Sequence, residues 1–405
     1  MEERGLTPAD IRTVADLQKL PALDKPTINA NRESLLSRAV AANHLTSGWS
    51  GGTTGERLNY HSTREERLTY SYARWALTFG WTGVRLGEPH MSIRQQTREP
   101  DKGLKQFGIR LQRLTKVDTM LVEEEHLDEI VKLINRVRPR AVFSYPSALA
   151  LVASYAKSQG LACPRIDAMC LGGERLLERQ REVLDEVFGG KQYVRYGSNE
   201  LHEVAGQCEM CGGLHILAED FIIEVVDNSG APMAPGQRGK LLITALHNYG
   251  MPFIRYENGD IGRLLQESCT CGRGLPLMDA GIGRIREYVR SRSGLRIPAL
   301  DMAVAPLLPP GVVQWQLIQE DYERFVLRAV PVREPVDDEW HAVRTRLARM
   351  IAGRLGTTVD VDVQRVDHIE MNLSGKRLSF ISNLPQETSA AADRAAAVKS
   401  EAESA

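Results

Sequence analysis

The pattern of apolar and polar positions has two different periods along the first half of the chain. Apolar residues recur at helical spacing in several stretches, which predict helices over 65–79, 127–137, 146–160 and 174–188. Short apolar runs between them predict buried strands over 141–143, 169–171 and 193–196. Residues 1–45 are expected to form short helices broken at Pro8, Pro21 and Pro26. Strands that alternate with helices are typical of α/β layers, so we expect an α/β fold.

The pattern changes after residue 205. Residues 214–227 and 239–246 alternate like strands with one wet face, and the Pro- and Gly-rich segment 228–240 predicts a hairpin loop. A strand–helix–strand pattern follows over 323–330, 337–355 and 357–366. We therefore expect a large domain over 1–283 and a small α+β domain over 284–385. Residues 386–405 are mainly Ala, Glu, Ser and Lys, which predicts a disordered tail.

Length and charge narrow the class of protein. A chain of 405 residues is too long for one ordinary core, which agrees with a large domain and a smaller one. The formal net charge of -1 gives no global field for nucleic acid or a membrane, so neither is an expected partner. No apolar run is long enough to span a membrane, and the charged start lacks the apolar stretch of a secretion signal. We expect a cytoplasmic protein.

A glycine-rich loop is the strongest local signal. Its residues are Ser50, Gly51, Gly52, Thr53, Thr54 and Gly55. Glycines let successive backbone N–H groups converge on an anion, and the hydroxyls add donors for phosphate oxygens. No Lys-Ser or Lys-Thr follows at the offset of a Walker motif. Taken alone, the segment is equally compatible with a flexible linker.

The glycine-rich loop is one of several segments that occur along the chain in a characteristic order. They are SGGTTGER, SYPSALALVASYA, LGGERL, YGSNE, NYGMPFIRYENGDIGRL, CTCGRG, GIGRIRE and NLSGKR. Together they resemble the adenylate-forming superfamily, in its branch of phenylacetate–CoA ligases and CapK-like proteins, from residue 6 to about 384. The resemblance implies a large multi-layer N-terminal domain with a small α+β C-terminal lid. It also implies activation of a carboxylic acid by ATP and Mg²⁺ to an acyl-adenylate, followed by acyl transfer to coenzyme A.

The resemblance implies a role for the end of the strand 193–196. Glu200 would hold Mg²⁺ beside the ATP phosphates, which suits a carboxylate at a strand end; the alternative is a glutamate that stabilises a helix N-terminus. Tyr196 would stack on the adenine, and Gly197 and Ser198 would border the nucleotide. The same base would be bordered by Gly172, Gly173 and Glu174, which could equally form a helix-start turn.

Three further positions complete the implied nucleotide site. Asp260 in YENGD would accept hydrogen bonds from the ribose hydroxyls, since one carboxylate accepts two donors; its alternative is an ordinary turn. Arg284 would reach the ribose or phosphate, or lie on the surface. Lys376 is the candidate catalytic lysine, because a mobile ammonium can neutralise charge that develops on the carboxylate and the α-phosphate. The alternative is a solvated lysine in a turn.

Two positions depart from the family pattern. Arg57 stands where proline usually follows the loop, and Arg286 stands where the hinge before the lid often has aspartate or lysine. The resemblance also implies that about sixty N-terminal residues of relatives have no counterpart here, as in a shortened member or an incomplete reading frame. The acyl pocket is expected to be lined by Tyr145, Pro146 and Ser147 and by the segment 75–81. An aryl or arylalkyl acid is favoured by the resemblance alone.

Four of the six cysteines form two close pairs. Cys208 and Cys211, with Cys269 and Cys271, provide four soft ligands that suit a tetrahedral structural Zn²⁺ within an insert near 205–275. His202 and His215 are substitutes if one cysteine does not bind. Free thiols or a disulfide are the alternatives, and Cys163 and Cys170 are expected to be core residues.

Other functions remain open at this point. The adenylate could pass to an amine, a hydroxyl or a carrier-protein thiol instead of coenzyme A. A zinc-stabilised binding protein with a degenerate nucleotide site is the non-enzymatic alternative. A zinc-ribbon nucleic-acid binder is disfavoured because the segment CEMCGGLHILAED is acidic. The acid and the oligomeric state, including a homodimer, are not determined.

Overall fold

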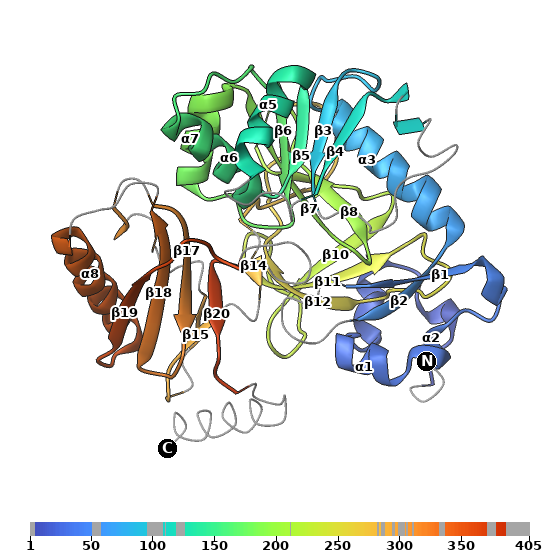
Figure 1. The fold of residues 1–405 in the computed structure, drawn as a ribbon. Coiled ribbons are helices and arrows are strands. Elements are labelled where there is room, and N and C mark those ends of the chain that lie inside the picture. Colours follow the sequence, from blue (N-terminus) through green and yellow to red (C-terminus); the bar gives the residue numbers. More distant parts are fainter. Residues whose placement is uncertain are drawn as a thin grey trace. The chain divides into compact units, whose positions relative to one another are not determined.

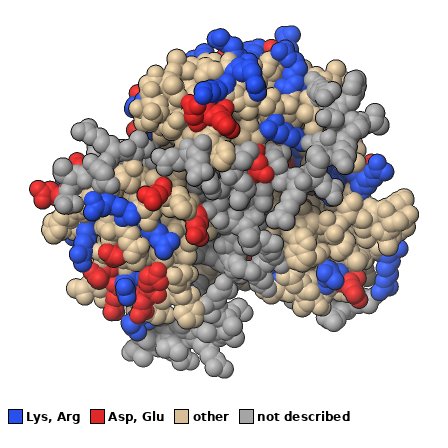
Figure 2. Space-filling model, viewed as in Figure 1, with Lys and Arg blue, Asp and Glu red and all other residues tan. Residues whose placement is uncertain are grey.

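The computed structural model describes residues 5–50, 58–94, 108–109, 111–118, 126–210, 212–281, 283–284, 288–293, 296–298, 304, 307–309, 312–331, 337–370 and 378–385. Of the described residues, those up to Arg284 form one compact unit and those from Tyr288 onward form a second. Among the described helices none is long and apolar enough to cross a membrane. Acidic and basic side chains mix on the visible surface (Figure 2), in keeping with the formal net charge of -1.

A sheet of eight strands dominates the first unit, in the order β13-β9-β8-β7-β6-β5-β3-β4 (Figure 1). These strands are β3 (His90–Ile93), β4 (Leu114–Val117), β5 (Ala141–Ser144), β6 (Ala168–Gly172), β7 (Lys191–Ser198), β8 (His202–Gly206), β9 (Leu214–Ile216) and β13 (Leu277–Met278). From β4 to β7 neighbouring strands are parallel, and from β7 to β13 they are antiparallel. Every residue of β5 and β6 is buried, as expected for parallel strands covered on both faces.

Helices cover both faces of the parallel strands. On one face lie α5 (Leu127–Val137), α6 (Pro146–Ser158) and α7 (Glu178–Phe188), whose apolar residues join one core cluster with β3, β5 and β6 (Figure 1). On the other face lies α3 (Ser71–Gly80), which follows a π-helical turn, η5 (Glu66–Tyr70). Phe79 of α3 packs with Phe143 and Tyr193 in a separate cluster. The α/β layers expected from the alternating pattern are confirmed.

Two local expectations were wrong. The helix predicted over 174–188 begins only at Glu178, because Gly173 has a left-handed backbone (φ 81°) and the side chain of Gln180 accepts the Leu177 N–H. Of the three prolines expected to break the N-terminal helices, only Pro21 does so, since it lies after the helix Val14–Lys19 and before Lys25–Ala30. Pro8 opens a short 3-10 helix and Pro26 lies in the first turn of α1, where a missing N–H has no cost. The N-terminal helices are η2 (Pro8–Asp10), η3 (Val14–Lys19), α1 (Lys25–Ala30), α2 (Arg32–Leu35) and η4 (Ala42–His44).

Two smaller sheets complete the first unit. The hairpin of β1 (Leu45–Trp49) and β2 (Asn59–Thr63) encloses the glycine-rich segment. An antiparallel sheet has the order β10-β11-β12-β14. Its strands are β10 (Phe221–Val226), β11 (Gly239–Ala245), β12 (Tyr256–Gly262) and β14 (Gly283–Arg284). The alternating pattern after residue 205 therefore forms antiparallel strands, as predicted.

The second unit is a small α+β layer. Its sheet has the order β19-β18-β17-β20, in which β17 and β18 are antiparallel and both outer pairs are parallel. The elements are β15 (Tyr288–Arg290), β16 (Arg296–Pro298), β17 (Val312–Gln319), β18 (Arg324–Pro331), α8 (Asp337–Leu355), β19 (Asp360–Arg365) and β20 (Phe380–Ser382). Leu347 and Ile351 of α8 pack with Phe325 and Leu327 of β18. The expected tail, 386–405, lies outside the described residues.

Candidate functional site

The carboxyl ends of β3, β5, β6 and β7 meet at one edge of the large sheet. The register pairs Ile93 with Ser144 and Ser144 with Leu171, and Gly172 with Arg195. Parallel strands present their carboxyl ends on one side, where ligands of open α/β sheets bind. The segments SYPS, LGGERL and YGSNE all begin at this edge, so the fold brings them together.

The base of the glycine-rich loop is closed by backbone pairing. The Ser50 N–H donates to the Leu58 carbonyl at 2.9 Å, and the Leu58 N–H donates to Ser50 Oγ at 2.8 Å. Ser50, predicted as a phosphate donor, thus also accepts a bond that closes the loop. Gly51, Gly52, Thr53, Thr54 and Gly55 lie outside the described residues, and so does Arg57.

Hydrogen bonds join this loop base to the end of β7. The Tyr60 hydroxyl donates to the Asn199 carbonyl at 2.8 Å, and Asn199 Nδ2 donates to the Trp49 carbonyl at 3.3 Å. Burial raises the pKa of Tyr60 to about 12, and the negative charge of Glu200 adds to the effect. The loop base and YGSNE therefore lie side by side.

Glu200 is a buried carboxylate held by one tyrosine. Its side chain is only 6% exposed, and its Oε1 accepts a hydrogen bond of 2.8 Å from the Tyr256 hydroxyl. Tyr256 is the first residue of β12 and is fully buried. Among the described basic side chains, none forms an ion pair with Glu200. An uncompensated buried carboxylate is costly, so this position favours a cation.

Asp260 belongs to a second, adjoining network. Its Oδ2 accepts hydrogen bonds from the Tyr196 hydroxyl at 2.9 Å and from Asn258 Nδ2 at 2.7 Å. The same Nδ2 lies 2.8 Å from the Tyr196 hydroxyl. Tyr196 and Asp260, predicted to touch adenine and ribose, are thus joined directly. Arg284 lies in β14, where its backbone pairs with Asp260.

The sequence interpretation missed Tyr60, Tyr256 and Asn258. A signal for the last two was present, because the strand β12 alternates strictly between buried and half-buried positions. Tyr256, Asn258 and Asp260 occupy alternate positions, so one face of one strand carries all three side chains. Tyr60 likewise lies at a buried position of an alternating strand, β2, but its contact with Asn199 depends on how the hairpin lies against β7.

Two glycines near the site are required by the backbone rather than by a ligand. A side chain on Gly197 would lie 1.9 Å from the His202 carbonyl oxygen, and one on Gly172 would lie 3.0 Å from the Arg195 carbonyl oxygen. Ser198 pairs with His202, whose backbone is left-handed (φ 59°). Glu174 contacts Ser147, whose N–H donates to Glu174 Oε2 at 3.2 Å. Glu174 thus satisfies the start of α6 and does not begin a helix of its own.

The expected acyl-pocket residues are divided between two places. Tyr145 is the N-cap of α6 and Pro146 is its first residue, and burial raises the pKa of Tyr145. Trp75 packs with the rings of Phe79, His90 and Phe143, at centroid distances of 5.1, 6.0 and 5.5 Å. Trp81, at the other end of the segment 75–81, lies 5.4 Å from the ring of His215 instead.

A buried ion pair supports β7 on the face of α3. Arg195 Nη1 donates to Glu203 Oε1 at 2.6 Å and to Thr78 Oγ1 at 2.6 Å, and Thr78 Oγ1 donates to the same carboxylate oxygen. Burial raises the pKa of Glu203, while Arg195 opposes the shift. This network links α3, β7 and β8 behind the strand that carries Tyr196.

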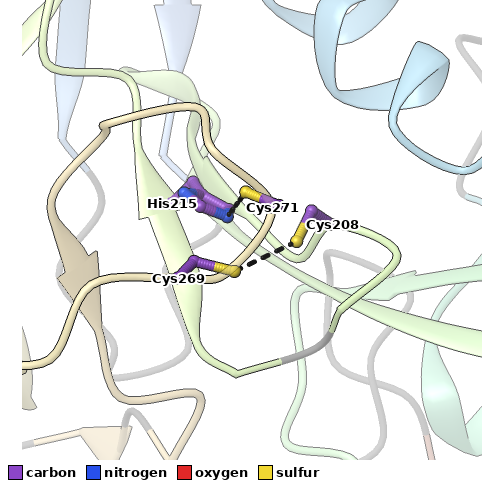
Figure 3. Close-up of side chains that lie close together, drawn as sticks. All are labelled: Cys208, His215, Cys269 and Cys271. Atoms are coloured by element: carbon purple, nitrogen blue, oxygen red, sulfur yellow. Dashed lines mark hydrogen bonds between the residues drawn. The ribbon is translucent and has the colours of Figure 1, made fainter.

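A thiol–imidazole cluster lies at the antiparallel edge of the sheet. It contains Cys208, His215, Cys269 and Cys271, whose ligand atoms all lie within 4.8 Å of one another (Figure 3). Cys208 Sγ lies 3.6 Å from Cys269 Sγ, and Cys271 Sγ lies 3.4 Å from His215 Nε2. These separations are close to those around a tetrahedral Zn²⁺, with bonds of about 2.3 Å to sulfur and about 2.0 Å to nitrogen. The donor set therefore fits zinc.

The predicted ligand set is only partly visible in this cluster. Cys211 lies outside the described residues, and His215 occupies the fourth corner. His202 is not among the four side chains, and Cys170 is buried. The cluster is braced by Arg273, which pairs with Glu209 at 2.9 Å and lies over the ring of Trp81 at 5.3 Å.

Comparisons with solved structures define the class of fold. A 2-hydroxyisobutyryl-CoA ligase in complex with 2-HIB-AMP matches with a TM-score of 0.75 and 18% identity, over 100% of this chain and 87% of that chain. An anthranilate CoA ligase with anthranoyl-AMP matches with a TM-score of 0.56 and 13% identity, over 82% of this chain and 65% of that chain. The expected fold is confirmed: the chain has the fold of the adenylate-forming ligases.

Sequence comparisons identify the relatives more narrowly. Residues 291–383 match the family model described as the CapK C-terminal domain. The phenylacetate–coenzyme A ligase of Thermus thermophilus is 31% identical over 255 residues, which are 57% of this chain and 57% of that protein. The Escherichia coli protein of the same name is 34% identical over 98 residues, or 23% of this chain and 22% of that protein. The chain thus spans little more than half the length of the first relative. The resemblance to this branch is confirmed.

Proposed function

We propose that this protein uses ATP and Mg²⁺ to activate a carboxylic acid as its acyl-adenylate, and then transfers the acyl group to coenzyme A. A substrate carboxylate would attack the α-phosphorus of ATP, and pyrophosphate would leave. Catalysis would consist of positioning and charge stabilisation. The fold and the relatives support this reaction.

One observation carries the proposal. The base of the glycine-rich loop, Glu200 and Asp260 come from distant parts of the chain, yet hydrogen bonds through Tyr60, Tyr256 and Tyr196 connect them to neighbouring strand ends. A nucleotide needs these three groups at one place, for its phosphates, its metal and its ribose. If these three groups lay on separate faces of the unit, they could not share one nucleotide.

The proposed roles follow from this placement. Mg²⁺, when bound, would neutralise phosphate charge, and Glu200 would hold it. Asp260 would accept the ribose hydroxyls, and Tyr196 would lie against the adenine. Lys376 lies outside the described residues and remains the proposed source of positive charge at the reacting phosphate. Lys376→Ala should then abolish adenylation without loss of fold.

Acid-dependent exchange between pyrophosphate and ATP tests the first step. The panel should contain phenylacetate, benzoates, short hydroxy acids and fatty acids, because the curated relatives act on phenylacetate by name. We propose an aryl or arylalkyl acid, which the rings near Trp75 also favour. If the protein is folded and binds ATP but none of these acids supports exchange, the result would favour a degenerate binding protein instead.

The acceptor requires a separate assay. With an active acid, added coenzyme A should yield a thioester that is detected by mass. Adenylate that accumulates with coenzyme A, and is consumed only by an amine, a hydroxyl or a carrier protein, would favour the alternative acceptors.

We also propose that the thiol–imidazole cluster binds a structural Zn²⁺. Cys208, Cys269 and Cys271 would supply thiolates, and His215 or Cys211 would supply the fourth ligand. Four protein ligands leave no open position for a reacting water, so the ion would stabilise the sheet edge. Metal analysis of purified protein tests this, and a protein with no zinc at full activity would contradict it.

A further inference from the structure

We infer that Tyr256 is a positioning residue that holds the Glu200 carboxylate in the orientation in which it binds Mg²⁺. This inference rests on the proposed function, because it concerns the metal of the same site. It adds a residue outside the implied metal and nucleotide ligands. Tyr256 would act through Glu200 and would not itself contact the ion or the substrate.

The geometry of the contact supports an orienting role. The Tyr256 hydroxyl lies 2.8 Å from Glu200 Oε1, and both side chains are buried. A carboxylate has about four lone-pair positions, so one hydrogen bond fixes the group and leaves capacity for a cation. Outer partners of this kind commonly orient the ligands of metal sites.

Tyr256 is itself held rigidly. Its ring packs against Phe253 with a centroid distance of 4.8 Å, and its side chain is completely buried. Its backbone pairs with Ile243 of β11 and forms a bridge with Leu23 on the other side. A donor on such a fixed base transmits its position to the carboxylate.

The neutrality of the donor also matters. A lysine or arginine at this place would neutralise Glu200 and compete with a divalent cation. A tyrosine hydroxyl fixes the carboxylate without removing its charge, provided that the phenol keeps its proton. The Tyr256 hydroxyl therefore brings no positive charge that would compete with a cation for Glu200.

A second tyrosine provides a matched control. Tyr60 is also buried and lies close enough to Glu200 for the negative charge to raise the pKa of the phenol. Its hydroxyl, however, donates to the Asn199 carbonyl and not to the carboxylate. Tyr60→Phe and Tyr256→Phe each remove one buried hydroxyl near Glu200, but only the second removes a donor from Glu200 itself.

The experiment measures ATP affinity by calorimetry at increasing Mg²⁺ concentration, for wild type, Tyr256→Phe, Tyr60→Phe, Glu200→Gln and the Tyr256→Phe/Glu200→Gln pair. We expect Tyr256→Phe to raise the half-saturating Mg²⁺ concentration roughly 10–100-fold, the usual cost of a lost outer partner. Tyr60→Phe should shift the Mg²⁺ dependence far less than Tyr256→Phe, because it removes no donor from Glu200. In the Glu200→Gln background, Tyr256→Phe should cause no further shift, because the two residues act in series.

Several results would overturn the inference. They are an unchanged Mg²⁺ dependence in Tyr256→Phe, an equal shift in Tyr60→Phe, an additive shift in the double variant, or wild-type protein whose ATP affinity ignores Mg²⁺. If Tyr256→Phe fails to fold, the tyrosine ultraviolet difference spectrum on Mg²⁺ addition decides. That signal should persist in Tyr60→Phe and vanish in Glu200→Gln, and its persistence in Glu200→Gln counts against the inference. Mg²⁺-dependent ATP binding without acid-dependent exchange would refute the proposed function alone.

Discussion

Two groups of polar side chains in the first unit are held together differently. Around Tyr196, the carboxylates of Glu200 and Asp260 accept hydrogen bonds from tyrosine and asparagine side chains. Around His215, the ligand atoms of three thiols and an imidazole lie within 4.8 Å of one another, with Cys208 Sγ 3.6 Å from Cys269 Sγ and Cys271 Sγ 3.4 Å from His215 Nε2. The first group is joined by hydrogen bonds among its own side chains, while the second is a set of electron donors whose arrangement suits a bound cation.

This difference predicts which property of the protein each group affects, ligand binding and rate or the stability of the fold. Hydrogen bonds from the protein fix the carboxylates before any ligand arrives, so changes there should affect binding and rate more than folding. A Zn²⁺ bound by the thiols, as proposed, would not be bound by the unfolded chain in the same way, so its binding energy would contribute to folding. The variants below test this division, from the largest expected effect to the smallest.

Glu200→Gln should lower acid-dependent ATP–pyrophosphate exchange roughly 100–1000-fold, since it removes the charge that is proposed to hold Mg²⁺. Its buried hydrogen bond with Tyr256 can persist through the amide oxygen, so the free energy of unfolding should change little. Exchange rates and chemical denaturation measure the two effects. If the variant loses stability as well as activity, the loss of exchange would reflect a structural role of Glu200 and not a role in binding Mg²⁺.

Cys269→Ser should show the opposite behaviour. We expect loss of bound zinc and a fall of about 2–5 kcal/mol in the free energy of unfolding, comparable to loss of a native cross-link. Exchange measured well below the melting temperature should persist. Cys163→Ser is the control, because Cys163 is a free thiol outside the cluster. Equal zinc content in both variants would refute the proposed ligand set.

Asp260→Asn should weaken ATP binding about tenfold, because a charged acceptor for the ribose is lost. A sharper comparison uses 2′- and 3′-deoxy-ATP. Wild type should discriminate against at least one of them, and Asp260→Asn should discriminate less, as expected when the hydroxyl and the carboxylate interact directly. Calorimetric titration measures each affinity. Undiminished discrimination in the variant would place the ribose elsewhere.

Many helices and strands were predictable from the sequence, because the apolar pattern that defines them lies within each segment. The helices 127–137 and 337–355 match α5 and α8 at both ends, since apolar residues at helical spacing define them. The start of the helix at Glu178 was misjudged because features outside the apolar pattern decided it. Gly173 has a left-handed backbone, Gln180 caps the Leu177 N–H, and Glu174 turns back to Ser147.

The candidate site was predictable only in part, for a related reason. Glu200, Asp260 and the cysteines stand in recognisable motifs, so the sequence could nominate them. Their partners depend on strand register and chain crossing, which bring Tyr60 next to Asn199 and His215 next to Cys271. Whether the nominated residues act as proposed is left to the variants.

His90 offers the smallest and most specific test, as a buried histidine outside the thiol–imidazole cluster. Burial lowers its pKa, while the hydrogen bond with the Glu88 carbonyl opposes the shift. Folded His90 thus stays neutral at pH values where unfolded histidine, with an ordinary pKa of about 6.5, takes up a proton. The free energy of unfolding should therefore fall as the pH drops below about 6.5, by at most about 1.4 kcal/mol per pH unit from this residue. His90→Gln should flatten that slope in denaturation series between pH 7.5 and 5.5, with zinc content unchanged. Equal slopes in wild type and variant would show that burial does not keep His90 neutral in the folded protein. Loss of zinc from the variant would show that His90 also supports the thiol–imidazole cluster.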